Sequence, residues 1–510
     1  MTSASLIILI TMAIYLVGMV AIGVIYNRKN ESGTDAFFLG GRQLSPLVTA
    51  MSAEASDMSS YLLMGLPGLA YLCGLAEVSW TVIGLAVGTY LNFLLVARRL
   101  RRYSANIGAI TIPDYLTRRF HDKKALLSCI AAVIIIVFFV PYTASGFKAV
   151  GTLFNSLFGW DYHTSMLIGA AVIVLYTVLG GFLAVSTTDL IQSIVMTIAL
   201  AAIVVFGIQS AGGWSNVVQN AELLPGYLNL TQGYDPVTDT AGSFGFLSII
   251  STLAWGLGYF GMPHILLRFM AIRNENDVKT SRRIASVWVV LSMSVAVLIG
   301  VIGLAVSQTG AIPQLKTSAE SETIVIQLAN LMSGHSALFA ISGGIVLSGI
   351  LAATMSTADS QLLAASSSVS KDLLQDFFKV KISDKIAIIV ARVTVVAIAL
   401  IALILAWNPN SSVFRVVSFA WAGFGAAFGP AILLSLFWRR MNCWGAFAGV
   451  FCGGAMVFIW KYLIAPLGGA FAIYELLPAF LVALIAIIVV SLLTPAPDET
   501  VLREFDEAKH

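Results

Sequence analysis

The sequence has little charge for its length. Only 11% of its 510 residues are Asp, Glu, Lys or Arg, whereas 58% are hydrophobic. Such a small number of charged groups cannot cover the surface of a soluble globular protein of this size. The composition therefore excludes a soluble globular protein and indicates a polytopic membrane protein. The net charge of +3 gives no support for nucleic-acid binding.

Cysteine and histidine are also scarce. The four cysteines lie in or beside apolar segments, at spacings that match neither a zinc site nor a disulfide framework. The five histidines are scattered and show no nucleophile–base pairing or metal-ligand spacing. We therefore expect neither an enzyme nor a bound cofactor.

Long apolar runs dominate what is present. Runs of about 20 residues predict thirteen transmembrane helices in an all-α protein. The predicted spans are 4–26, 45–72, 76–96, 126–151, 164–186, 189–210, 243–271, 284–307, 336–370, 386–406, 413–437, 443–463 and 474–494. The first run has no basic residue before it and no cleavage site, so we expect it to remain as a span.

The distribution of basic residues predicts the orientation. With the N-terminus outside and the C-terminus in the cytoplasm, 25 of the 29 Lys and Arg residues fall on the cytoplasmic side. The eight in residues 97–124 and five from Arg268 to Arg283 are the largest groups. The loop 211–243 has no Lys or Arg, so we expect it outside. The four exceptions are Lys148, Lys316, Arg415 and Lys461.

The second predicted span contains an unusual polar stretch, residues 52–61, with Glu54, Asp57 and four serines. A carboxylate in the middle of a bilayer costs about 2.5–3.5 kcal/mol even on the insertion scale, so such groups face a wet cavity or a cation. Ser and Asp also loosen a helix by bonding to the backbone. We predict a helix break at residues 55–60 whose freed oxygens bind a small hard cation.

The seventh span is the second irregular one, because residues 255–264 contain three glycines and a proline. An interval of five spans gives the two broken helices opposite orientations, which is typical of an inverted repeat with its site near the membrane midplane. We predict one transmembrane domain over 1–510. Its parts are an extra helix at 4–26, repeats at 45–210 and 243–437, two added helices at 443–494 and a cytoplasmic tail at 495–510.

The ninth span carries a polar stripe. Ala353, Ser356, Thr357 and Ser360 recur at helical spacing on one face, and Asp359 lies beside it. Isolated Ser or Thr residues often bond only to their own helix, but a stripe with a carboxylate is harder to explain in that way. Hard monovalent cations prefer such oxygen ligands.

These motifs together resemble the sodium/solute symporter family. The resemblance rests on Gly40-Gly-Arg42, Ala55-Ser-Asp-Met-Ser59, Leu63-Met-Gly-Leu-Pro-Gly68, residues 176–185, 255–264, 353–357 and 418–430, and it extends from about residue 35 to 493. It implies the leucine-transporter-like inverted-repeat fold in the bacterial inner membrane. It also implies sodium-driven import of a small amino or imino acid, with L-proline favoured.

The resemblance implies roles for individual residues. The sodium ligands would be the backbone oxygens of Ala55, Met58 and Ala353 and the hydroxyls of Ser356 and Thr357, with Asp57 needed for coupling. A second sodium site of some relatives would fall on Asp189, Asp359 and Ser360. The substrate would contact Ser59, Ser60, Tyr61, Tyr142, Trp255, Gly256, Tyr259 and Pro263. Trp255 and Tyr259, four residues apart, could both close on one apolar ring.

Four residues depart from the family's usual pattern. Ser60 and Tyr61 replace Gly-Trp, Glu54 replaces glycine and Met262 replaces glutamine. The Tyr61 hydroxyl favours a slightly more polar substrate.

Two further residues have two interpretations each. Asp189 lies in Ser186-Thr-Thr-Asp189 at the predicted cytoplasmic junction between spans five and six, where a helix cap is the simpler interpretation. Arg42 is either a positively charged membrane anchor or part of the inner gate.

Other functions remain open at this level. Proton coupling or uniport is an alternative, because Glu54 and Asp57 could exchange protons. Another small solute could replace proline. This fold also occurs in membrane sensors joined to kinase domains, against which the short tail after residue 493 argues.

Overall fold

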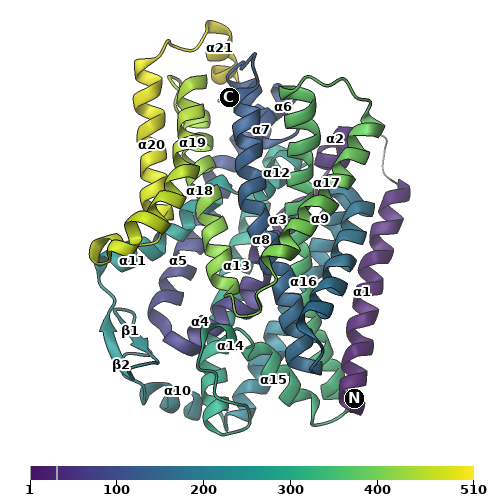
Figure 1. The fold of residues 1–510 in the computed structure, drawn as a ribbon, viewed down its shortest axis with the longest axis vertical. Coiled ribbons are helices and arrows are strands. Elements are labelled where there is room, and N and C mark those ends of the chain that lie inside the picture. Colours follow the sequence, from purple (N-terminus) through teal and green to yellow (C-terminus); the bar gives the residue numbers. More distant parts are fainter. Residues whose placement is uncertain (1, 30–32, 510) are drawn as a thin grey trace.

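The computed structural model describes residues 2–29 and 33–509, and helices dominate it. The first helix, α1 (Ser3–Lys29), starts at the bottom of the molecule in Figure 1, and the last, α21 (Glu499–Glu507), lies at the top. The chain therefore begins and ends at opposite ends of the helical bundle.

The first half of the chain forms the helices that carry most of the predicted site. They are α2 (Thr34–Leu39), η1 (Gly40–Arg42), α3 (Pro46–Ser60), η2 (Tyr61–Gly65), α4 (Leu66–Cys73), α5 (Leu75–Leu91), η3 (Asn92–Ala97), α6 (Arg98–Asn106), α7 (Ile112–Arg119), α8 (Leu126–Phe158) and α9 (Tyr162–Ser210). Ser45 caps α3, and Pro46 occupies its first turn, where the missing N–H costs nothing.

The second half repeats this alternation of long and broken helices. It contains α10 (Trp214–Glu222), β1 (Gln232–Asp235), β2 (Thr240–Ser243), α11 (Phe246–Leu253), η4 (Ala254–Gly261), α12 (Pro263–Ala271), η5 (Glu275–Asp277), α13 (Val278–Gln308), α14 (Ser318–Ser321), α15 (Ile324–Ser333), α16 (Ala337–Ser367), η6 (Ser368–Phe377), α17 (Asp384–Leu405), α18 (Val413–Phe437), α19 (Cys443–Ile459), η7 (Trp460–Ile464), η8 (Ala465–Leu467), η9 (Gly469–Phe471) and α20 (Leu476–Leu493).

The predicted count of thirteen spans is not confirmed. Within the described residues, ten helices are long and apolar enough to cross a membrane, or eleven if the bent pair Phe246–Gly261 and Pro263–Ala271 counts as one span. The segment from α3 to α4 does not meet this test; it holds Glu54 and Asp57, and its backbone leaves helical geometry at Ser59.

The number of long apolar helices is also lower than predicted because the single helix α9 contains both predicted spans 164–186 and 189–210. Its 49 residues would extend about 74 Å as a straight helix, more than twice the bilayer core. The backbone is non-helical at Gly181, where φ is 65° and ψ is −176°. Glycine accepts this conformation at no steric cost, so α9 consists of two helical arms that meet at Gly181. The predicted junction at residues 187–188 is therefore wrong.

The two loops that predict the orientation lie at opposite ends of the molecule. Helices α6 and α7, from residues 97–124, are at the top of Figure 1. Helix α10 and the antiparallel β1–β2 hairpin, from residues 211–243, are at the bottom, with α14 and α15 nearby. The structure thus separates the most basic loop from the loop without Lys or Arg.

The bundle's centre is built around α16, which packs against α9, α3 and α8. On another side, α5 packs against η4 through glycines. A Cβ at Gly88 would lie 2.6 Å from Cα of Gly256, and one at Gly84 would lie 3.0 Å from Cα of Leu253. Only glycine allows the two backbones to approach so closely.

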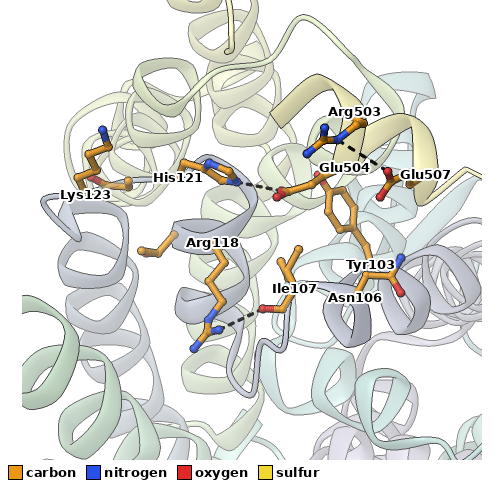
Figure 2. Close-up of a pocket in the computed structure, with 11 residues that line it drawn as sticks. Tyr103, Asn106, Ile107, Arg118, His121, Lys123, Arg503, Glu504 and Glu507 are labelled. Atoms are coloured by element: carbon orange, nitrogen blue, oxygen red, sulfur yellow. Dashed lines mark hydrogen bonds and ion pairs between the residues drawn. The ribbon is translucent and has the colours of Figure 1, made fainter. Parts of the chain in front are cut away.

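The predicted tail, 495–510, contains helix α21, which lies against the ends of α6 and α7. Its Phe505 is buried, and the Arg119 guanidinium lies 5.0 Å from the Phe505 ring centre. Figure 2 shows the adjoining cavity of about 840 Å³, where His121 Nε2 lies 2.9 Å from a Glu504 carboxylate oxygen. The tail is therefore an ordered part of this end of the bundle.

Candidate functional site

The break in α3 falls at Ser59, within the stretch predicted from the serines and carboxylates. Ser59 has φ 48° and ψ −171°, and its hydroxyl accepts a hydrogen bond from the Tyr61 N–H at 3.1 Å. The Tyr61 N–H also bonds to the carbonyls of Met58 and Ser59, and a π-helical turn begins at Tyr61. A side-chain hydrogen bond thus supports the irregular backbone at this point.

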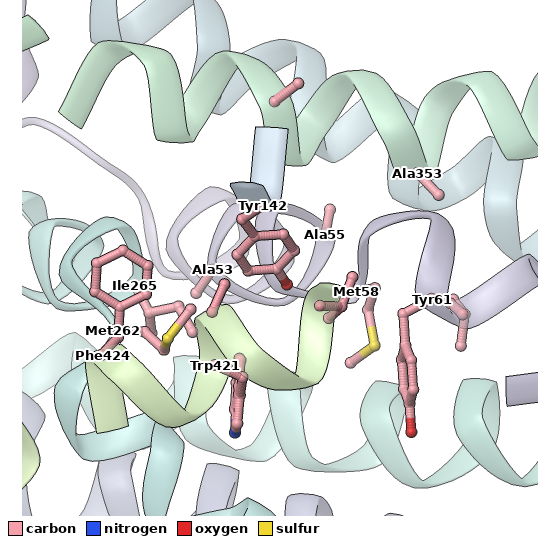
Figure 3. Close-up of a cluster of buried hydrophobic side chains, with 14 of the residues drawn as sticks. Ala53, Ala55, Met58, Tyr61, Tyr142, Met262, Ile265, Ala353, Trp421 and Phe424 are labelled. Carbon is pink, nitrogen blue, oxygen red and sulfur yellow. The ribbon is translucent and has the colours of Figure 1, made fainter. Parts of the chain in front are cut away.

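Four of the five predicted sodium ligands meet between α3 and α16. The Ser356 hydroxyl lies 2.8 Å from the Ala55 carbonyl oxygen and 3.2 Å from that of Ala353. The Thr357 hydroxyl lies 3.2 Å from the same Ala353 oxygen. Figure 3 shows Ala55, Met58 and Ala353 in this buried region. Two hydroxyls and two carbonyls therefore converge, and rotation of the hydroxyls would present their lone pairs to a cation.

The fifth predicted ligand, Met58, is buried in the last turn before the break. Its carbonyl accepts the Tyr61 N–H and retains a second lone pair. Within the described chain, no hydrogen bond joins Met58 to Ser356 or Thr357.

Asp57 faces a different element from the predicted ligands. Its Oδ2 accepts a hydrogen bond from the Tyr259 hydroxyl of η4 at 2.5 Å, and its backbone carbonyl accepts one from Tyr142 of α8 at 3.2 Å. Asp57 thus connects the broken helix α3 to the second irregular segment, η4. The structure does not bring its carboxylate to Ser356 or Thr357.

The predicted substrate residues adjoin an aromatic cluster formed by Tyr61, Trp255, Phe414, Trp421 and Tyr474. Trp255 stacks on Tyr61 at 5.7 Å and on Tyr474 at 5.0 Å between ring centres, and lies 5.6 Å from Phe414. The Trp421 indole N–H donates to the Trp255 carbonyl at 2.8 Å. These rings come from four separate parts of the chain, so they join the broken helices to α18 and the segment before α20.

Trp255 and Tyr259 do not form the simple two-ring clamp predicted from their spacing. Trp255 stacks within the aromatic cluster, whereas the Tyr259 ring meets Trp421 edge-on at 5.1 Å and its hydroxyl contacts Asp57. Gly256 serves the close approach of η4 to Gly88. Pro263 is the first residue of α12, so it terminates the irregular segment.

Phe414, Trp421 and Tyr474 are members of the cluster that sequence reasoning missed as site residues. Trp421 lies in the quoted motif 418–430, so a signal was present. Phe414 and Tyr474 have no local signal, because their neighbours are distant in sequence.

Glu322 is another residue without a sequence signal, and it holds Phe414 in place. Its carboxylate accepts hydrogen bonds from the N–H groups of Val413 and Phe414, both at 3.1 Å, and from the Ser412 hydroxyl at 2.7 Å. Glu322 therefore caps α18, where the helix dipole also favours a negative charge. Lys148 Nζ lies 3.8 Å from this carboxylate, and both side chains are buried.

The predicted second sodium site is brought together, but around an arginine. The Arg268 guanidinium lies 3.1 Å from Asp189 Oδ2 and 2.5 Å from the Ser360 hydroxyl, and it donates to the Ser52 hydroxyl at 3.0 Å. Ser360 in turn donates to Asp359 at 3.2 Å. We call Arg268, Ser52, Asp189, Asp359 and Ser360 the guanidinium cluster.

One expectation for this region is wrong. Asp189 is not a helix cap, because it lies eight residues beyond Gly181 inside α9 and is fully buried. Arg268, which the sequence groups with the basic residues of the cytoplasmic side, is buried within α12. A buried carboxylate needs a partner, and Arg268 supplies it.

Arg42 links four segments at the end of the bundle that carries α6 and α7. Its guanidinium donates to the carbonyls of Met270, Ser104 and Ala109 at 2.8, 3.1 and 2.6 Å, and to the Ser104 hydroxyl at 3.2 Å. Burial lowers the pKa of Arg42 to about 10. These hydrogen bonds favour a gate element over a freely exposed anchor.

Comparison with known proteins agrees with this geometry. The model of the sodium:solute symporter family matches residues 37–453. The chain belongs to the sodium:solute symporter family. It is 44% identical over 492 residues to the high-affinity proline transporter PutP of Bacillus subtilis, covering 96% of this chain and 98% of the relative. It is 42% identical over 501 residues to the sodium/proline symporter of Escherichia coli, covering 98% and 96%.

Solved structures of other transporters have the same fold as this member of the sodium:solute symporter family. A substrate-bound, outward-open Na⁺-coupled sialic acid symporter has a TM-score of 0.78 at 18% identity, covering 97% of this chain and 99% of the other. Mhp1, a nucleobase-cation-symport-1 family transporter, has a TM-score of 0.54 at 15% identity, covering 94% and 98%. The predicted leucine-transporter-like class is confirmed. The protein is a multi-pass membrane transporter and not an enzyme.

Proposed function

We propose that this protein imports L-proline, or a closely related amino acid, together with sodium. The observation that carries this proposal is its 44% and 42% identity, over nearly the whole chain, to relatives named for proline transport and sodium/proline symport. The Ser356–Ala55 contact supports the sodium part, and the aromatic cluster supports binding of a small apolar ring.

Sodium would bind to Ala55, Met58, Ala353, Ser356 and Thr357, with Asp57 coupling the ion to the substrate. A cation held between α3 and α16 would fix the last turn of α3 and therefore the position of Ser59 and Tyr61. Because Asp57 also contacts Tyr259, ordering of α3 is transmitted to η4. Such coupling is a difference in affinity between states, typically 1–3 kcal/mol.

The substrate ring would lie against Tyr61, Trp255 and Tyr142, and its carboxylate would bind backbone N–H groups at the breaks. Ser60 and Tyr61, which replace the usual Gly-Trp, have buried hydroxyls without hydrogen-bond partners in the described chain. Buried polar groups normally find partners. These hydroxyls support a substrate with one more polar group than proline, so hydroxyproline should compete with proline for uptake.

Uptake by the purified protein in liposomes tests the proposal. Radiolabelled proline should accumulate with an inward sodium gradient and not when choline replaces sodium outside. Competition by hydroxyproline and the other amino acids would define the substrate range. Equal uptake in sodium and choline would contradict sodium coupling and favour a proton-coupled carrier or uniporter.

We further propose that the N-terminus and the 211–243 loop are outside and the 97–124 loop and C-terminus are cytoplasmic. In a variant without native cysteines, Val237→Cys should react with an impermeant thiol reagent added to cells, because Val237 is 88% exposed. Lys123→Cys should react only after the cells are opened. Labelling of Lys123→Cys in intact cells would show that the protein has the opposite orientation.

A further inference from the structure

Glu54 is a buried charged residue that the proposed sodium and substrate sites do not use. Its side chain is 1% exposed, and neither carboxylate oxygen has a hydrogen-bond partner among the described residues. No ion pair in that part of the chain includes Glu54 or its neighbour Asp57. A buried carboxylate without hydrogen bonds or a positive partner is strongly unfavourable, so Glu54 must either hold a proton or have a bound cation beside it.

Glu54 and Asp57 lie three positions apart, on the same face of α3. Ser52 and Ala55 contact Asp189 of α9 and Ser356 of α16 instead. The nearby guanidinium is committed elsewhere, since Arg268 bonds to Ser52, Asp189 and Ser360. Thus the two carboxylates lie on the side of α3 away from Ser52, which contacts Arg268.

Further buried oxygens lie around Tyr259, whose hydroxyl contacts Asp57. Asn92 donates its Nδ2 to the Tyr259 carbonyl at 2.9 Å, and its Oδ1 is buried without a partner in the described chain. The Thr89 hydroxyl is likewise buried; it lies close to the Tyr259 hydroxyl and has no other hydrogen-bond partner among the described residues. Tyr259 also contacts Asp57 and lies within the electrostatic reach of Glu54.

We propose that Glu54 and Asp57 Oδ1, with oxygens from Thr89 and Asn92, bind a second sodium ion between α3, α5–η3 and η4. The donors are all oxygens, the ligand type that hard cations prefer. One or two anionic oxygens would balance the ion's charge in a site from which bulk water is excluded. This site is separate from both the Ser356–Ala55 region and the guanidinium cluster.

This inference rests on the proposed sodium-coupled transport, and the ion-to-substrate ratio tests it. With the membrane voltage held at zero, a tenfold sodium gradient supports about 10-fold substrate accumulation with one coupled ion and about 100-fold with two. We expect about 100-fold accumulation of radiolabelled proline by the wild-type protein in liposomes. Glu54→Gln, which keeps the side-chain volume and removes the charge, should give about 10-fold.

Two further variants guard against a simple folding defect. Glu54→Asp keeps the carboxylate and should retain about 100-fold accumulation at saturating sodium. Thr89→Val removes one neutral oxygen at nearly constant volume and should raise the half-saturating sodium concentration without lowering the final accumulation. Direct binding of radioactive sodium to the purified protein without substrate should fall from two ions to one in Glu54→Gln.

The outcomes separate this inference from the proposed function. Absence of sodium-dependent accumulation of any amino acid would reject the proposed function itself. Sodium-driven accumulation of only about 10-fold by the wild-type protein would reject the second site alone. Equal accumulation by wild type and Glu54→Gln would also reject it, because the second ion would then bind elsewhere.

Discussion

Two polar contacts between the same two helices, one helical turn apart, have opposite electrostatic designs. At one, Ser356 of α16 meets Ala55 of α3, and neutral hydroxyl and carbonyl oxygens converge. At the other, Arg268 joins Ser52 of α3 to Ser360 of α16, beside Asp189. The oxygens of the first contact are joined by hydroxyl hydrogen bonds, whereas a guanidinium lies among the oxygens of the second. A proposed sodium ion therefore fits the first contact, where it would replace hydroxyl hydrogens, and the second contact already holds a permanent positive charge.

The largest expected effect comes from removing that guanidinium. Arg268→Gln leaves Asp189 as a buried, unpaired carboxylate, so the folded protein should lose about 3–5 kcal/mol of stability. Thermal unfolding of the purified protein would measure the loss. The double variant Arg268→Gln, Asp189→Asn should recover much of it. Wild-type stability in the single variant would show that Asp189 is compensated in another way.

Removal of a neutral oxygen at the first contact should change sodium affinity. Ser356→Ala or Thr357→Ala should weaken it by roughly 1.5–3 kcal/mol, or about ten- to hundredfold, because a desolvated cation loses a ligand. The sodium dependence of proline uptake would show the shift, with recovery at high sodium. Thr357→Ser keeps the hydroxyl and should change the affinity far less. An unchanged sodium dependence in both alanine variants would show that the α16 hydroxyls do not bind sodium.

Changes in the aromatic cluster should affect the substrate before sodium. Trp255→Ala removes the ring that stacks on Tyr61 and Tyr474. We expect a loss of about 1–2 kcal/mol in substrate binding, or roughly a 5- to 30-fold higher half-saturating proline concentration. Trp255→Phe should retain most of the affinity. Equal shifts for proline and sodium would assign Trp255 to the structural core instead.

The smallest effect is expected from an exposed ion pair that contrasts with Arg268–Asp189. Arg439 lies 2.9 Å from Asp506 of α21, and both side chains are about half exposed. Arg439 lowers the pKa of Asp506, so any stabilisation is present above the ordinary carboxyl pKa and is lost as the pH falls through the lowered one. Asp506→Asn should hardly change thermal unfolding at neutral pH, and the difference from wild type should vanish in acid. A large change at neutral pH would mean that α21 contributes more through this pair than its exposure suggests.

Features of the site could be predicted from the sequence where all the residues that form them lie in one helix. The spacing of Ser356 and Thr357 placed two hydroxyls on one face, and the serines near Asp57 located the departure at Ser59. Both features follow from local periodicity and backbone competition.

Sequence reasoning failed where the decisive partner is distant in sequence. Asp189 resembled a helix cap because of the threonines before it, and Arg268 gave no sign of a buried partner because it begins a run of basic residues. Their 79-residue separation conceals the ion pair. Phe414 and Tyr474 were missed for the same reason, since only tertiary packing brings their rings to Trp255.

The glycine contact between α5 and η4 has a mechanical consequence for the transport cycle. Gly84 and Gly88 bring the α5 backbone into direct contact with Leu253 of α11 and Gly256 of η4, which leaves no room for a side chain between them. Trp255 precedes Gly256 in the chain and Tyr259 follows it by three residues, so a methyl group added at Gly88 would push η4 away and displace both rings without touching the substrate.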